Sequence, residues 1–146
     1  MEYRFFPDSQ PCDPQKGDFS DESGDVGKEI KNLSKHNQAL FLRVNTFLKA
    51  LQKVNDLTPF LQNEQIFKFP KEYDDLYEMR IPKQARGGVF RIYFCKSLKA
   101  LNTLILLCAE LKHKAKPMKL KVAMEKLKQY KEYVKQGVML WKKIKS

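Results

Sequence analysis

Residues 76–116 read LYEMRIPKQARGGVFRIYFCKSLKALNTLILLCAELKHKAK, and this stretch decides the fold. It holds three runs of strand composition, at residues 76–81, 89–95 and 103–109. Gly87 and Gly88 lie between the first two runs. Because glycine reaches positive φ without steric cost, this pair predicts a β-hairpin. The third run is apolar at every position from Leu104 onward, which is typical of a central strand covered on both faces.

The third run ends in a cationic segment that holds Lys112, His113, Lys114 and Lys116. The chain has a net charge of +11, and this charge is unevenly spread. Residues 1–27 carry two Lys/Arg against seven Asp/Glu, whereas the rest carries 26 against ten. A basic surface of this kind attracts polyanions, with nucleic acid or the ribosome first and an acidic protein or a membrane surface second. The alternative is a solvated lysine face that serves only solubility.

The N-terminal part of the chain combines a strand, a loop and a helix. Residues 2–6 (EYRFF) predict a short aromatic strand. Residues 7–27 are rich in Pro, Gly, Ser and acids, so we expect a mobile acidic loop, either a tolerated insertion or a flap over the basic face. From about residue 28 to residue 55 the apolar positions recur with helical period, and Ser34 is a candidate N-cap.

The remaining segments complete an α+β domain. Phe67 and Phe69 alternate as in an edge strand, residues 118–135 show an amphipathic helix pattern, and residues 136–146 form a C-terminal tail. We therefore predict one domain over residues 1–146. It consists of a small, twisted, mainly antiparallel sheet on which an N-terminal helix or helical hairpin and a C-terminal helix pack.

The predicted hairpin places two arginines opposite each other on its paired strands. Alternation along the first strand places Glu78 and Arg80 on one face, and hairpin pairing centred between Ala85 and Arg86 brings Arg80 opposite Arg91. Two adjacent arginines repel each other unless a carboxylate or phosphate bridges them. Either an anion binds here, or Glu78 completes an intramolecular ion-pair network.

Several classes of function lack a sequence signature. There is no phosphate-binding glycine motif, nucleophile elbow or HExxH, and two histidines give no zinc site. The cysteines (Cys12, Cys95 and Cys108) form no CxxC pair and read as reduced, buried small hydrophobes. No apolar run is long enough for a membrane span, so we expect a cytoplasmic protein without metal or cofactor. RNA cleavage remains open, because RNA carries its own nucleophile, the 2′-OH, and needs only alignment, cationic groups and proton transfer.

Several motifs together resemble the HigB-like, phage-derived branch of the RelE/ParE toxins. They are LYEMRI, GGVFRIYF, LILLCAELKHKAKP and AMEKLKQY, and the resemblance covers about residues 28–135 and the opening EYRFF strand. It implies a RelE-like fold and the toxin of a type II toxin–antitoxin pair. Such a toxin is a ribosome-dependent, metal-independent mRNA endonuclease. Its partners are mRNA on the ribosome and a cognate antitoxin, usually a helix-turn-helix DNA-binding protein, and the pair binds its own operator DNA.

The resemblance also assigns candidate site residues. Arg91 matches the strand arginine that contacts the scissile phosphate, and Arg80 matches an arginine of the preceding strand. Lys112, His113 and Lys114 occupy the position of basic catalytic groups, and the general base is His113 or a lysine beside it. The remaining candidates are Tyr130 as a catalytic group, and Arg86, Tyr93, Lys116 and Lys119 as RNA contacts.

Two further functions stay open beside the endonuclease. One is a ParE-like toxin that acts on DNA gyrase without cutting RNA, although the cationic segment at residues 112–116 argues against it. The other is a catalytically degenerate member that only binds RNA or its antitoxin. Glu78 motivates that alternative, because it stands where RelE itself has a lysine.

Overall fold

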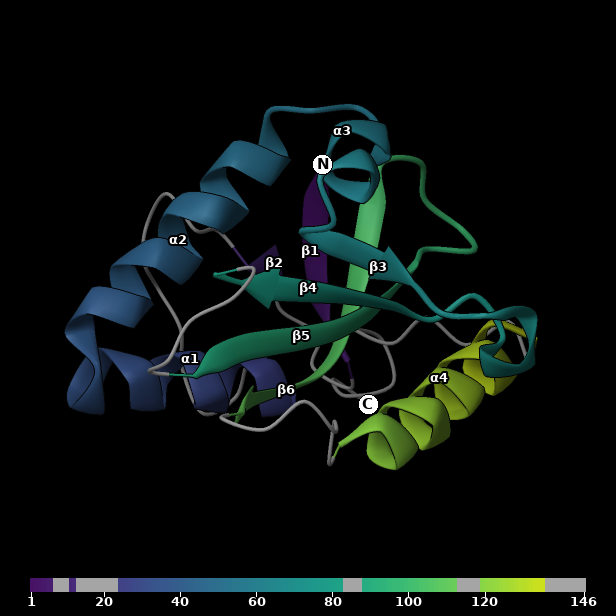
Figure 1. Cartoon of the computed structure of the whole chain (residues 1–146). Helices are drawn as coiled ribbons and strands as arrows, with labels where there is room; N and C mark the ends of the chain where they lie inside the picture. The colour runs from purple at the N-terminus through teal and green to yellow at the C-terminus, as the bar shows by residue number, and fades with distance from the viewer. Residues whose placement is uncertain (7–10, 13–23, 83–87, 113–118, 136–146) are drawn as a thin grey trace.

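The computed structural model describes residues 1–6, 11–12, 24–82, 88–112 and 119–135. The chain is an α+β domain built on one six-stranded sheet with the order β2-β1-β6-β5-β4-β3 (Figure 1). β1 pairs with β6 in parallel and all other neighbours are antiparallel, so the predicted mainly antiparallel sheet is confirmed. The strands are β1 (Glu2–Phe5), β2 (Pro11–Cys12), β3 (Ile66–Lys68), β4 (Tyr77–Ile81), β5 (Val89–Lys96) and β6 (Thr103–Lys112).

The N-terminal helical region, predicted to be either one helix or a helical hairpin, consists of two successive helices. The helices are α1 (Gly24–His36), α2 (Gln38–Gln52), α3 (Thr58–Gln62) and α4 (Leu120–Lys135), with a short 3₁₀ turn η1 (Lys71–Tyr73). Asn37 begins α2, since its side chain accepts a 3.2 Å hydrogen bond from the backbone N–H of Leu40. The prediction that Ser34 is an N-cap is wrong, because Ser34 lies inside α1 and its hydroxyl donates to the carbonyl of Lys31.

The predicted acidic loop is shorter than expected. α1 already begins at Gly24, and Val26 is buried in the core, so residues 24–27 belong to a helix and not to a loop. Pro11–Cys12 forms a short strand beside β1. The rest of the predicted loop and the tail at 136–146 lie outside the described residues. None of the described helices is long and apolar enough to cross a membrane.

Helices cover both faces of the sheet, so the protein has two hydrophobic cores. Figure 1 shows α1 and α2 on one side of the sheet and α4 on the other. The first core joins α1 and α2 to the inward residues of β4 and β5, such as Met79 and Ile92. The second joins α4 to Leu76 and the opposite face of β5 and β6. Buried apolar area is the main term that stabilises such a layered domain.

β6 is the central strand that the apolar run predicted. Its residues from Leu104 to Ala109 are all buried, and they contribute to both cores. The register with β5 shifts between Tyr93 and Phe94, whose partners are Cys108 and Leu106. The extra residue is Leu107, so that Leu107 and Cys108 both face the second core. Beyond this bulge, the register brings Arg91 opposite Glu110.

Candidate functional site

The candidate site begins with two arginines on neighbouring strands. Arg80 of β4 is the register partner of Arg91 of β5, as the hairpin pattern predicts. Both lie on the face of the sheet that carries α4, because their apolar neighbours Met79 and Ile92 belong to the opposite core. Strand alternation therefore places two guanidinium groups side by side on one surface.

Glu78 pairs with both arginines. Arg91 Nη1 donates to Glu78 Oε2 at 3.2 Å, and Arg80 Nε donates to Glu78 Oε1. The Glu78 side chain is 0% exposed and that of Arg91 only 9%, whereas that of Arg80 is 35% exposed. The intramolecular network that the sequence left as an alternative is therefore present. Removing one partner of a buried ion pair of this kind strongly destabilises the folded protein, by about 3–5 kcal/mol.

Glu110, the register partner of Arg91, links Tyr93 to the start of α4. Tyr93 Oη donates to Glu110 Oε2 at 2.9 Å, and the backbone N–H of Lys119 donates to the same oxygen at 2.8 Å. Burial raises the pKa of the Tyr93 hydroxyl, and the hydrogen bond to Glu110 raises it further, so the hydroxyl stays a donor. The predicted RNA contact of Tyr93 is corrected, since the ring is fully buried and offers no surface to a substrate.

Charge within this described cluster is balanced. Two arginines, Arg80 and Arg91, face two carboxylates, Glu78 and Glu110. Arg80 is the cation of this set with a substantially exposed side chain, and its guanidinium carbon lies 5.3 Å from the ring centroid of Phe67. Arg80 is therefore the guanidinium that an incoming anion can reach first.

The Lys119 side chain is engaged with α1. Its ammonium lies 3.3 Å from Asp25 Oδ2 and 3.7 Å from Glu29 Oε1. Burial alone would lower the pKa of Lys119, but the charges of Asp25 and Glu29 outweigh it and raise this pKa. The structure does not support the predicted RNA contact of Lys119, because the two carboxylates already neutralise the ammonium. Its backbone nevertheless anchors α4 through Glu110.

Tyr130 lies at the opposite end of α4 from Arg91. Its hydroxyl accepts a 3.0 Å hydrogen bond from the backbone N–H of Leu98 and lies 3.4 Å from Ser97 Oγ, both in the β5–β6 turn. Tyr130 follows the start of α4 at Leu120 by ten residues, or about 15 Å along the helix axis. The predicted grouping of Tyr130 with Arg91 is therefore corrected: this tyrosine fixes α4 to the turn.

The cationic segment after β6 is described only at its first residue. Lys112 ends β6 opposite Val89, so its backbone lies beside the strand that carries Arg91. Nothing is described of the Lys112 side chain. The other basic candidates lie outside the described residues, and their assigned roles stay predictions: Arg86, His113, Lys114 and Lys116.

The described thiols do not supply a nucleophile. Cys95 and Cys108 are free and buried, as predicted. Burial raises the pKa of each thiol to about 12, so both stay protonated near neutral pH.

Sequence reasoning missed Glu110 and the role of Phe67. Glu110 is the one charged residue in the run from Thr103 to Leu111, and a lone charge in a buried strand is the signal that could have identified it. Phe67 was recognised only as part of an edge strand, because its contact with Arg80 depends on the pairing of β3 with β4.

No protein-family model, curated protein or solved structure matches the chain. Membership of the RelE/ParE toxins remains a prediction from the sequence motifs.

Proposed function

We propose that the chain is the toxin of a type II toxin–antitoxin pair and cleaves mRNA on the ribosome. The observation that supports the proposal best is the position of Arg80 and Arg91, which are register partners on β4 and β5. They lie near the end of the sheet where β6 ends at Lys112. Guanidinium groups recognise phosphate oxygens through paired N–H donors. A chain with a net charge of +11 is also attracted to RNA over a distance.

In the proposed reaction the 2′-OH of a ribose attacks the adjacent phosphorus, and the bond from phosphorus to O5′ breaks. The products are a 2′,3′-cyclic phosphate and a 5′-hydroxyl. Arg80 stabilises the negative charge that develops on the phosphate oxygens, and Glu78 orients Arg80 through its Nε donor. Arg91, which the resemblance assigns to the scissile phosphate, has a side chain only 9% exposed and paired with Glu78, so we assign the phosphate contact to Arg80 instead. Arg91 balances the charge of the buried Glu78 and thereby holds this carboxylate in place.

Proton transfer is assigned to the segment that follows β6. His113, or a lysine beside it, takes the proton of the attacking 2′-OH, and a second basic group of the same segment returns a proton to the leaving O5′. Neutral imidazole is available near pH 7, which favours His113 as the base. This assignment rests on sequence position.

The proposed partner is a cognate antitoxin, usually a helix-turn-helix DNA-binding protein, with which the toxin binds operator DNA. An acidic or amphipathic segment of the antitoxin would cover the face that carries Arg80, because opposite charges steer and orient such contacts. Toxin bound to excess antitoxin should then leave mRNA intact.

Purified protein added to translating ribosomes tests the proposal, with mRNA cleavage read by primer extension. We expect wild-type protein to cut the mRNA, and Arg80→Gln to cut it at least about a hundredfold more slowly, the usual loss when one charge-stabilising donor is removed. Arg4→Gln is the matched control, since Arg4 is a half-buried arginine of β1, two strands away from β5 in the sheet. Intact mRNA under conditions in which a RelE-type toxin cuts would contradict the proposal.

A second function, RNA or antitoxin binding without cleavage, is favoured by one observation. Glu78 already pairs with both arginines, as a phosphate would. If this pairing persists with RNA bound, the arginines cannot both serve a phosphate. Binding with a strong salt dependence and no cleavage would establish this second function.

A further inference from the structure

An exposed aromatic ring lies next to the two-arginine cluster. Phe67 of the edge strand β3 pairs opposite Glu78, so both side chains lie on the same face of the sheet as Arg80. Phe67 is 41% exposed. The guanidinium of Arg80 lies over its ring, 5.3 Å from the centroid. A guanidinium group thus already forms a cation–π contact with an aromatic ring at the surface.

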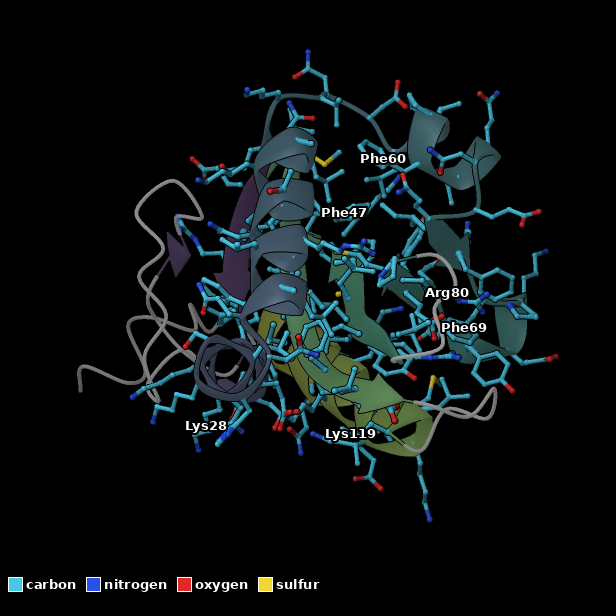
Figure 2. All side chains as sticks on the ribbon, turned by 60° about the vertical axis from the view of Figure 1, so that its left-hand side comes forward. Lys28, Phe47, Phe60, Phe69, Arg80 and Lys119 are labelled. Atoms are coloured by element: carbon cyan, nitrogen blue, oxygen red, sulfur yellow. The ribbon has the colours of Figure 1, made fainter. Side chains whose placement is uncertain are left out.

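Other rings hold Phe67 in place from below. The Phe67 and Phe69 rings meet edge to face, with centroids 5.1 Å apart and an interplanar angle of 89°. The ring of Phe69 in turn packs near the rings of Tyr73 and the buried Tyr93, with centroid distances of 5.4 Å and 6.3 Å. Arg80 and Phe69 both contact Phe67, and Figure 2 shows them on the side of the molecule away from α1. The exposed ring therefore belongs to a row of aromatic contacts that leads into the core, which restricts its motion.

We propose that Phe67 and Arg80 form a stacking site for one unpaired base of single-stranded RNA. Aromatic rings beside cationic groups are the usual platform for single-stranded nucleic acid, because every base has a π-face. Arg80 serves both parts of a nucleotide: its plane extends the stack, and its edge donates to the phosphate. The inference rests on the proposed function and adds a base-binding subsite to the phosphate site.

Single strands fit this surface better than duplexes or proteins. The bases of an RNA duplex are already stacked on each other and cannot reach Phe67, whereas an unpaired base can. A protein strand could add to the edge of β3, but such pairing uses backbone groups and does not require a guanidinium over an aromatic ring. The positive net charge of the chain also favours a polyanion.

The affinity of a fluorescently labelled single-stranded RNA hexamer, measured by anisotropy at several salt concentrations, tests the inference. Phe67→Leu keeps an apolar side chain on β3 but removes the π-face, so we expect affinity to fall about tenfold. Its salt dependence should stay that of the wild type, because no charge changes. Phe67→Trp should bind within about threefold of wild type. Arg80→Gln should reduce the slope of log affinity against log salt by about 0.7, the contribution of one phosphate contact in a single strand.

Controls separate stacking from other effects. Leu101→Ala removes another exposed apolar side chain, in the β5–β6 turn, and should leave the affinity unchanged. Urea unfolding midpoints show which variants are folded. A blunt-ended RNA duplex of two strands, which has no unpaired bases, should bind wild type and Phe67→Leu equally, because only the phosphate contacts remain.

The outcomes distinguish this inference from the proposed function. Equal affinity of wild type and Phe67→Leu for the hexamer would overturn the stacking site, even if the protein cuts mRNA on ribosomes. A tenfold loss in a protein that leaves ribosomal mRNA intact would support the stacking site and contradict the endonuclease. If Phe67→Leu weakened a peptide or antitoxin contact while RNA affinity stayed constant, the surface would be a protein interface and the inference would be wrong.

Discussion

Replacement of Arg91 by methionine should destabilise the fold through Glu78. The Glu78 side chain is fully buried, and Arg91 supplies a 3.2 Å ion pair to one of its oxygens. Methionine fills much of the same volume but cannot donate a hydrogen bond. Removing one partner of a buried pair costs about 3–5 kcal/mol, and we expect the lower end because Arg80 still pairs with Glu78.

Urea denaturation followed by circular dichroism measures this change. With a slope of about 1.5 kcal/mol per molar urea, a loss of ~3 kcal/mol lowers the midpoint by about 2 M. The double variant Glu78→Leu/Arg91→Met removes both charges, so its stability should return to within about 1 kcal/mol of wild type.

Arg4 provides the matched control for this prediction. Its ion pair with Glu2 is 3.6 Å long and exposed on the Glu2 side, so the loss of this pair should contribute less than about 1 kcal/mol to the effect of Arg4→Met. Equal midpoints for Arg91→Met and Arg4→Met would refute the view that Glu78 is a buried carboxylate dependent on Arg91. A double variant as unstable as Arg91→Met would refute the coupling between the two residues.

Three further predictions follow from contacts outside the arginine pair. Tyr130→Phe should lower stability by about 1 kcal/mol in urea titrations, because the N–H of Leu98 loses its acceptor. The same variant should leave the rate of mRNA cleavage unchanged, and a hundredfold slower cleavage would restore Tyr130 as a catalytic group. Asn37→Ala should cost about 1 kcal/mol by loss of the α2 cap, and an unchanged urea midpoint would show that this cap adds nothing. Burial raises the pKa of Cys95 and Cys108 from 9.0 to about 12, so the folded protein keeps protons that the unfolded chain loses; stability from these thiols is present below about pH 9 and is lost towards pH 12. As the pH rises across that range, the urea midpoint should fall less steeply for Cys95→Ala/Cys108→Ala than for wild type. Identical slopes of midpoint against pH would contradict the raised pKa of the two thiols.

The strands were predictable because their signals are local. Alternation along β4 and β5 and the continuous apolar run of β6 identify faces and burial without knowledge of distant residues. The opposition of Arg80 and Arg91 follows from the centre of one hairpin, and the structure confirms it. Local periodicity did not separate α1 from α2, since both helices face the first core and the apolar period continues across Asn37.

The contacts around the site depend on long-range geometry, which one sequence does not show. Lys119 meets Asp25 across 94 residues of chain, so a lysine that looked free to bind RNA is neutralised. The bulge at Leu107 of β6 sets the register that brings Glu110 opposite Arg91. Tyr130 was grouped with the arginines because α4 follows β6 in sequence, but the length of the helix carries this residue to the far end of the sheet.

The chemical nature of the ends of cleaved mRNA tests the central proposal most directly. Ribosomes arrested during translation are treated with wild-type protein in a Mg²⁺ buffer that keeps them intact, and the fragment ends are analysed. We expect 2′,3′-cyclic phosphate and 5′-hydroxyl ends, because the 2′-OH is the proposed nucleophile and Arg80 the proposed charge-stabilising group. Fragments with 5′-phosphate ends, or mRNA left whole while a RelE-type toxin cuts it, would contradict the proposed function.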